Sequence, residues 1–293
     1  MNVVTTTTEL RRILAPIRER ERIAFVPTMG CLHKGHLSLI RKAKKMADIV
    51  VVSIYVNPLQ FGPNEDFNTY PRIFEEDCRL CEDEGVDFIF HPESLYPEGG
   101  IRISLKVDEL DNSLCGASRP GHFDGVVTAV NILFNIVQPH IAIFGEKDFQ
   151  QLAIITRMVS DLKIGVEIIG AAIVREADGL AMSSRNRYLS SDQRQRAATI
   201  YAALSIMQDA FKGGEHFART LLTIGQNKLN KSGIEPEYLE IRDAVTLQPS
   251  DELILKQSRI FIAAKIGNTR LIDNIALEHA TKHTSEHAME TML

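Results

Sequence analysis

Short apolar runs alternate with amphipathic segments up to about residue 187. The run at 49–56 (IVVVSIYV) is nearly continuous and rich in β-branched residues, as expected for a strand buried on both faces. Leu37, Leu39, Ile40 and Ala43 recur at helical spacing among lysines and arginines. The pattern predicts strands at 22–27, 49–56, 88–91, 141–144 and 166–174, with further helices at 73–84, 125–137 and 149–162. This alternation predicts an α/β fold with a doubly wound, Rossmann-like parallel sheet.

The pattern changes beyond about residue 187. One long helix is predicted at 192–211, where Lys212-Gly213-Gly214 marks its end, and another helix extends to about 231. Strands follow at 238–242, 260–266 and 270–274, and Gly267-Asn268 suits a hairpin turn between the last two. We therefore expect residues 1–186 to form the larger domain and residues 187–293 a smaller α+β domain, with a mobile tail after about 277.

Composition limits the classes of function. The 293 residues are 44% apolar, which is enough for a buried core. A net charge of −5 and a pI near 6.0 argue against binding nucleic acid over a broad surface. The sequence shows no secretory signal and no apolar run long enough to cross a membrane. Its four cysteines are too scattered to indicate a disulfide scaffold. We expect a cytoplasmic protein without nucleic-acid or membrane partners.

The turn after the first predicted strand is the first candidate site. It spans residues 27–36 (PTMGCLHKGH) and leads into a predicted helix, whose N-terminal N–H groups bind anions. Gly30 and Gly35 allow close approach of a ligand, and His33 and His36 can donate hydrogen bonds to phosphate oxygens. The alternatives are histidines that only cap the helix, or a zinc site, which would need further ligands. The strand–turn–helix context favours a nucleotide.

Two other polar loops follow predicted strands. After the strand at 141–144, Lys147 can neutralise phosphate charge, and Asp148 can accept from a nucleotide hydroxyl or help to hold magnesium. The stretch at 181–187 (AMSSRNR) offers hydroxyl and guanidinium groups that suit phosphate recognition. Each stretch alone could be an ordinary charged loop. Ligands of parallel sheets bind at the carboxyl ends of strands, and this location favours a site.

Three weaker features complete the candidates. Asn57 and Gln60 follow the second strand and offer amides to a polar substrate. Residues 119–125 (RPGHFDG) precede a predicted helix as an anion-binding turn or a capped loop. Glu75, Glu76 and Asp77 form an acidic first helical turn, which the helix dipole favours. A metal contact at Glu76 and Asp77 is the alternative.

Together these segments resemble the pantothenate synthetases (pantoate–β-alanine ligases), within the HIGH-motif nucleotidyltransferase superfamily. The resemblance rests on residues 27–36, 55–72, 119–125, 145–151 and 174–189, in order along the larger domain. It implies that this domain binds ATP and pantoate, and that pantoate reacts with ATP to form a pantoyl-adenylate and pyrophosphate. β-Alanine then attacks the adenylate, giving pantothenate and AMP, in coenzyme A biosynthesis. Mg²⁺ assists, and members of the family are typically homodimers.

The resemblance also implies residue roles. His36, His33, Lys147 and Arg185 would be catalytic, with His36 the proton donor. Gln60 and Gln151 would bind pantoate, and Gln60 would also bind β-alanine. ATP would contact Met29, Gly30, Cys31, Leu32, His33, Lys34, Gly35, His36, Gly145, Glu146, Lys147, Asp148, Val174, Met182, Ser183, Ser184 and Arg185.

Two departures from the family pattern and three rival functions remain. Cys31 stands where the family often has a small residue such as alanine, and Arg185 stands where related signatures often have lysine. A simple adenylyltransferase would share the histidine turn but lack the glutamine pair. A catalytically silent ATP-binding regulator would not need His33, His36, Lys147 and Arg185 together. A transfer-RNA synthetase would need a basic surplus.

Overall fold

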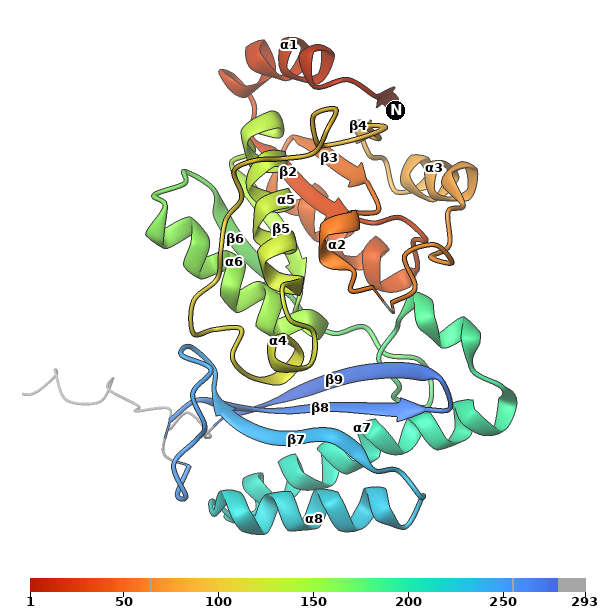
Figure 1. Ribbon diagram of the computed structural model, residues 1–293, viewed down its shortest axis with the longest axis vertical. Helices are drawn as coiled ribbons and strands as arrows, with labels where there is room; N and C mark the ends of the chain where they lie inside the picture. The colour runs from red at the N-terminus through yellow and green to blue at the C-terminus, as the bar shows by residue number, and fades with distance from the viewer. Residues whose placement is uncertain (64, 255, 279–293) are drawn as a thin grey trace, which may run out of the picture.

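The computed structural model describes residues 1–63, 65–254 and 256–278. Within these ranges, six parallel strands form one sheet and three antiparallel strands form a second. The two sheets belong to a larger N-terminal domain and a smaller C-terminal domain (Figure 1). The predicted fold class is confirmed.

The elements of the larger domain alternate as expected. They are β1 (Asn2–Val4), α1 (Thr7–Arg18), β2 (Ile23–Thr28), α2 (Lys34–Met46), β3 (Ile49–Ile54), η1 (Pro58–Gln60), α3 (Phe74–Asp83), β4 (Phe88–Phe90), α4 (Leu114–Ser118), α5 (His122–Val137), β5 (Ile141–Gly145), η2 (Glu146–Asp148), α6 (Phe149–Asp161), β6 (Glu167–Ala171) and η3 (Ser184–Tyr188). The strand order is β1-β4-β3-β2-β5-β6. The order reverses between β2 and β5, and the crevice at such a switch point is the usual ligand site of this architecture.

Alternate side chains of each strand enter opposite layers. Phe25 and Val51 pack with α1, α5 and α6, whereas Val26 and Val52 pack with α2 and α3. Because both faces are covered, the strands read as continuous apolar runs, which is why they were recognisable in the sequence. The helices hold the sheet rigid, and the polar loops at its carboxyl end can diverge without disturbing the core.

The smaller domain is a sheet backed by two helices. Its elements are α7 (Ser191–Lys212), α8 (Ala218–Asn230), β7 (Pro236–Asp243), β8 (Ser258–Ile266) and β9 (Thr269–Leu277). Helices α7 and α8 cover one face of the sheet, and the other face lies toward the larger domain (Figure 1). Phe149 of α6 packs against Phe261 of β8, which joins the two domains through apolar contact.

The predicted elements differ from the observed ones chiefly in one strand and two helices that were missed, near the N-terminus and before α5, and in the end of one strand. Helix α1 was missed, although Leu10 and Leu14 have helical spacing and Thr6 caps it, because Pro16 obscures the pattern. Strand β1 and helix α4, of three and five residues, are too short to leave a periodic signal. The strand predicted at 166–174 was wrong at its end, since β6 stops at Ala171 and the chain leaves the sheet to line a cavity.

Two sequence predictions about chain organisation are not settled by these elements. The domain boundary at 186/187 falls inside η3, and Leu180 already packs with the core of the smaller domain. It stays a prediction. Most of the tail predicted to be mobile lies outside the described residues.

Candidate active site

A cavity of about 250 Å³ opens at the switch point between β2 and β5. Its walls come from the β2–α2 turn, η1, the start of α5, η2 and the segment that follows β6. The predicted site residues that line it are Met29, His33, Gly35, His36, Gln60, Gly145, Lys147, Asp148, Gln151, Val174, Met182, Ser183, Ser184 and Arg185. A larger cavity of about 1230 Å³ between the domains shares Lys147, Gln151 and Arg185 with it. The structure therefore brings the three predicted loops together.

The β2–α2 turn is held from behind by a buried carboxylate. Asp77 accepts the backbone N–H groups of Cys31 at 2.9 Å and Leu32 at 2.7 Å. Gly30 has φ +80, and a Cβ there would lie 2.8 Å from Asp77, so glycine is needed both for its dihedral and for space. Cys31, at φ 52, is fully buried. Asp77 thus shapes the turn that carries the histidines.

Some predicted residues do not reach either cavity. Gly30, Cys31, Leu32 and Lys34 are not among the described residues that line them, so contact with ATP at these positions stays a prediction. In the part of the chain that the structure describes, no group of three His, Cys, Asp or Glu side chains could hold a metal. Asp77 already accepts two N–H groups, and a metal contact at Glu76 and Asp77 also stays a prediction.

The two histidines cap helix α2 and still present donors. Nδ1 of His33 accepts the N–H of Gly35 at 3.1 Å, and Nδ1 of His36 accepts the N–H of His33 at 3.3 Å. Burial lowers the pKa of His33 to about 4 and that of His36 to about 3, and Lys147 adds to both shifts. Each ring is therefore neutral at pH 7, with its proton on Nε2. The capping and phosphate-donating alternatives are compatible, because they use different nitrogens.

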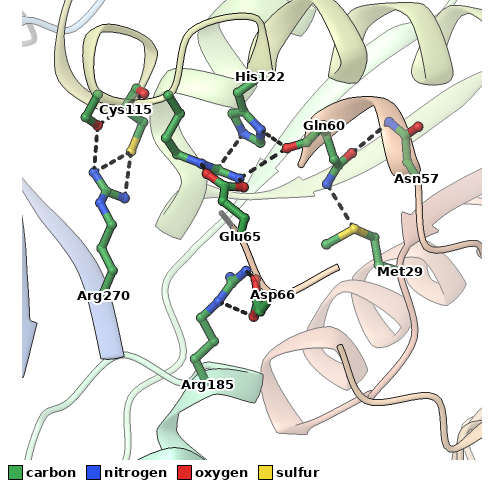
Figure 2. Close-up of polar contacts among 11 residues, drawn as sticks. Met29, Asn57, Gln60, Glu65, Asp66, Cys115, His122, Arg185 and Arg270 are labelled. Atoms are coloured by element: carbon green, nitrogen blue, oxygen red, sulfur yellow. Dashed lines mark hydrogen bonds and ion pairs between the residues drawn. The ribbon is translucent and has the colours of Figure 1, made fainter. Parts of the chain in front are cut away.

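An amide network orients Gln60. Nδ2 of Asn57 donates to Oε1 of Gln60 at 3.0 Å (Figure 2). The same Nδ2 donates to the carbonyl of Gly125 at 3.1 Å. Nε2 of Gln60 then faces the sulfur of Met29 at 2.9 Å, a weak acceptor that a substrate oxygen can replace. A Cβ at Gly125 would lie 2.2 Å from the carbonyl oxygen of Leu59, so glycine lets α5 approach η1 closely.

Acidic side chains already pair with the two arginines at the cavity. Arg185 donates to Asp66 through Nε at 3.1 Å and through Nη2 at 2.8 Å. Arg119 donates to Glu65 through Nε and Nη2, both at 2.6 Å. Figure 2 shows Glu65 near the pair of Asp66 and Arg185. Sequence reasoning assigned no role to Glu65 or Asp66. Nothing in their local pattern marks them, since their partners are 54 and 119 residues away.

Turn η2 places a lysine between the two domains. Lys147 lines both cavities, and its Nζ lies 3.8 Å from Asp148. Glu146 pairs with Arg259 of β8 at 3.0 Å and lines neither cavity, so its predicted contact with ATP stays a prediction. Gln150 is 5% exposed and holds the backbone of Cys115, whereas Gln151 lines both cavities.

Imidazole N–H groups, an ammonium and a guanidinium thus converge at the switch point of a parallel sheet. This combination defines an α/β enzyme that binds a phosphorylated nucleotide. A sequence model of the family described as Pantoate-beta-alanine ligase matches residues 2–276, and the chain belongs to this family. Its members are ligases that join pantoate to β-alanine, and this chain is such a ligase.

Named relatives agree over nearly the whole chain. The pantothenate synthetase of Pseudomonas putida (strain W619) is 49% identical over 94% of this chain and 97% of its own length. That of Trichlorobacter lovleyi is 51% identical over 90% and 94%. The crystal structure of pantothenate synthetase from Thermus thermophilus has a TM-score of 0.89 and 44% identity, covering 94% of this chain and 99% of that one.

A further solved structure carries ligands. It is the pantoate-beta-alanine ligase of Francisella tularensis, complexed with beta-gamma ATP and β-alanine. Its TM-score is 0.78 at 36% identity, covering 95% of this chain and 98% of that one. Across the described ranges of the present chain, no helix combines the length and apolar character required to cross a membrane.

Proposed function

We propose that the ligase works through a pantoyl-adenylate made and consumed in the switch-point cavity. The carrying observation is that the histidine pair, Lys147, Arg185 and the two pocket glutamines converge on this one cavity. A carboxylate is a poor acyl donor in water, because its oxygen is a poor leaving group. Adenylation converts that oxygen into a good one.

The first step uses the phosphate-binding side of the cavity. The pantoate carboxylate oxygen attacks the α-phosphorus of ATP, and the bond to the β-phosphate oxygen breaks. The neutral Nε2–H groups of His33 and His36 donate hydrogen bonds that stabilise the charge developing on the phosphates. Of the two, His36 would be the proton donor. Lys147 and Arg185 neutralise the departing pyrophosphate.

The second step uses the amide side. Gln60 and Gln151 hold pantoate, and Gln60 also binds β-alanine, so that the amine faces the acyl carbon. The amine forms the new C–N bond, AMP leaves with the carboxyl oxygen, and one proton is released. Positioning of the amine accounts for most of the rate acceleration in this step, since the acyl group is already activated.

Mg²⁺ fits the donor set as a companion of ATP. It is usually bound through one or two carboxylates, substrate phosphates and water. Asp148 is the carboxylate that lines the cavity beside Lys147 and would hold it. When bound, the ion neutralises phosphate charge.

ATP–pyrophosphate exchange tests the proposal. With pantoate and Mg²⁺ but without β-alanine, we expect exchange that depends on pantoate, then AMP and pantothenate when β-alanine is added. His36→Ala should lower the exchange rate by about two orders of magnitude while the protein stays folded. Absence of exchange in a folded sample that binds ATP would favour the silent regulator, and an unchanged rate in His36→Ala would remove the role of His36.

A cytoplasmic location and a homodimer are part of the same proposal. They are supported by the family that the sequence resembles, whose members are biosynthetic enzymes and typically homodimers. Light scattering on the purified enzyme measures the mass directly, and a mass near 33 kDa rather than twice that value would exclude the dimer.

A further inference from the structure

The turn that carries Lys147 is fastened to the smaller domain by one asparagine. Nδ2 of Asn274, on β9, donates to the carbonyl of Glu146 and to the carbonyl of Lys147, both at 2.9 Å. Asn274 is 2% exposed, so water cannot replace these bonds readily. Both N–H groups of the amide are used, and the orientation of the side chain follows.

The asparagine is itself held on its other sides. Its Oδ1 accepts from Nη1 of Arg259, whose Nη2 donates to the Glu146 carboxylate at 3.0 Å. Its backbone N–H donates to Asp273 at 2.8 Å, and Asp273 pairs with Arg175 at 2.6 Å. Turn η2 is therefore held by its backbone and by the side chain of Glu146.

These contacts require the burial of a charged guanidinium, that of Arg259, which costs desolvation free energy. Arg259 is 9% exposed, and its Nε lacks a hydrogen-bond partner among the described residues. Its guanidinium lies 3.9 Å from the ring of Phe149, and burial lowers its pKa. Buried charges of this kind add little to stability, but in some proteins they favour one packing arrangement over the alternatives. The arrangement favoured here is that of η2.

We propose that Asn274 is a positioning residue for adenylation, fixing the backbone of η2 so that the ammonium of Lys147 meets the phosphates. The inference rests on the proposed role of Lys147. It gives the smaller domain a part in the first chemical step, although Asn274 does not itself line either cavity. A small displacement of a charge-stabilising group costs as much as 10²-fold in rate.

The test compares exchange rates of five variants with wild type. Asn274→Ala removes both donated bonds, and Asn274→Asp keeps the shape but cannot donate to a carbonyl. Lys147→Ala and the double variant with Asn274→Ala show whether the effect passes through the lysine. Gln208→Ala is the matched control, because its amide also donates to a backbone carbonyl, that of Ala276 on β9 at 2.8 Å, but from α7 and away from η2.

We expect both Asn274 variants to lower kcat for exchange by about 10- to 100-fold, with KM for pantoate within about twofold of wild type. Gln208→Ala should lower the melting temperature but keep kcat. The double variant should match Lys147→Ala. A full rate in a folded Asn274 variant, or losses that multiply in the double variant, would overturn this inference alone. A full rate in Lys147→Ala would overturn the proposed role of the lysine and the inference with it.

Discussion

Asp66 is expected to compete with ATP for Arg185. The carboxylate binds the guanidinium through two hydrogen bonds, and their side chains are 25% and 32% exposed. Exposed pairs contribute about 0.2–1 kcal/mol, and breaking a buried pair costs about 3–5 kcal/mol. A half-buried pair of this geometry falls between them, at about 1.5 kcal/mol. If phosphate replaces Asp66, that energy is lost from ATP binding.

Asp66→Asn removes the charge and keeps the size. We expect the Kd of a non-hydrolysable ATP analogue, measured by titration calorimetry, to fall by about tenfold, since about 1.4 kcal/mol is a factor of ten. The gain should shrink in high salt. Asp161→Asn is the control, because Asp161 binds Arg157 with two 2.8 Å bonds on the outer surface of α6. It should leave the Kd unchanged.

A second comparison identifies the partner of Asp66. Arg185→Ala and the Arg185→Ala, Asp66→Asn double variant should bind the analogue equally, because the competition needs the guanidinium. Unchanged or weaker binding in Asp66→Asn would refute the reasoning. It would mean that Asp66 leaves without cost or that the carboxylate supports the bound state.

Three other outcomes are expected. Gln60→Ala should raise the KM for pantoate in steady-state assays but spare ATP binding by calorimetry, and a loss of ATP binding alone would contradict this division of the pocket. Asp77→Ala leaves the N–H groups of Cys31 and Leu32 without their acceptor. At about 1–3 kcal/mol for each group, the free energy of unfolding in urea should fall by about 2–6 kcal/mol. A loss below about 0.5 kcal/mol would show that water replaces the carboxylate. The depressed pKa of His36, about 3, means that only the unfolded chain takes up this proton between about pH 6.5 and pH 3, so stability falls on acidification by on the order of 1 kcal/mol per pH unit. In His36→Asn, the free energy of unfolding, measured by urea titration at pH 6, 5 and 4, should fall less steeply with falling pH than in wild type. The same slope in both proteins would refute the assignment of this pKa to His36.

Much of the site was predictable because its residues lie in strand-to-helix loops. His33, His36, Lys147 and Arg185 were identified from their place after apolar runs, and the structure gathers them at the switch point. Gln60 was identified from its place after the second strand, but the pantoate-binding role of Gln60 and Gln151 came from the family resemblance. The role of Asp77 in holding the backbone of the β2–α2 turn was not predictable. An acidic residue in the first turn of a helix is already explained by the helix dipole.

The neutral state of the histidines also required the structure. A His-x-x-His turn in sequence allows charged rings, capping rings or metal ligands. The burial of the two rings and the nearby charge of Lys147 keep both histidines neutral, since both effects lower their pKa values. What remains is a pair of hydrogen-bond donors whose capping bonds point them into the cavity.

By itself, the sequence determined the alternation of strands and helices, the place of the polar turns that line the cavity and the hairpin of the smaller domain. These features have periods of two to four residues or depend on glycine at a single turn, so they are written locally. Only the tertiary structure decided that Asp66 pairs with Arg185 and that Asn274 holds the backbone beside Lys147. Those partners are 119 and 127 residues apart, and no local pattern encodes contacts over such separations. The second contact forms only when the two domains pack.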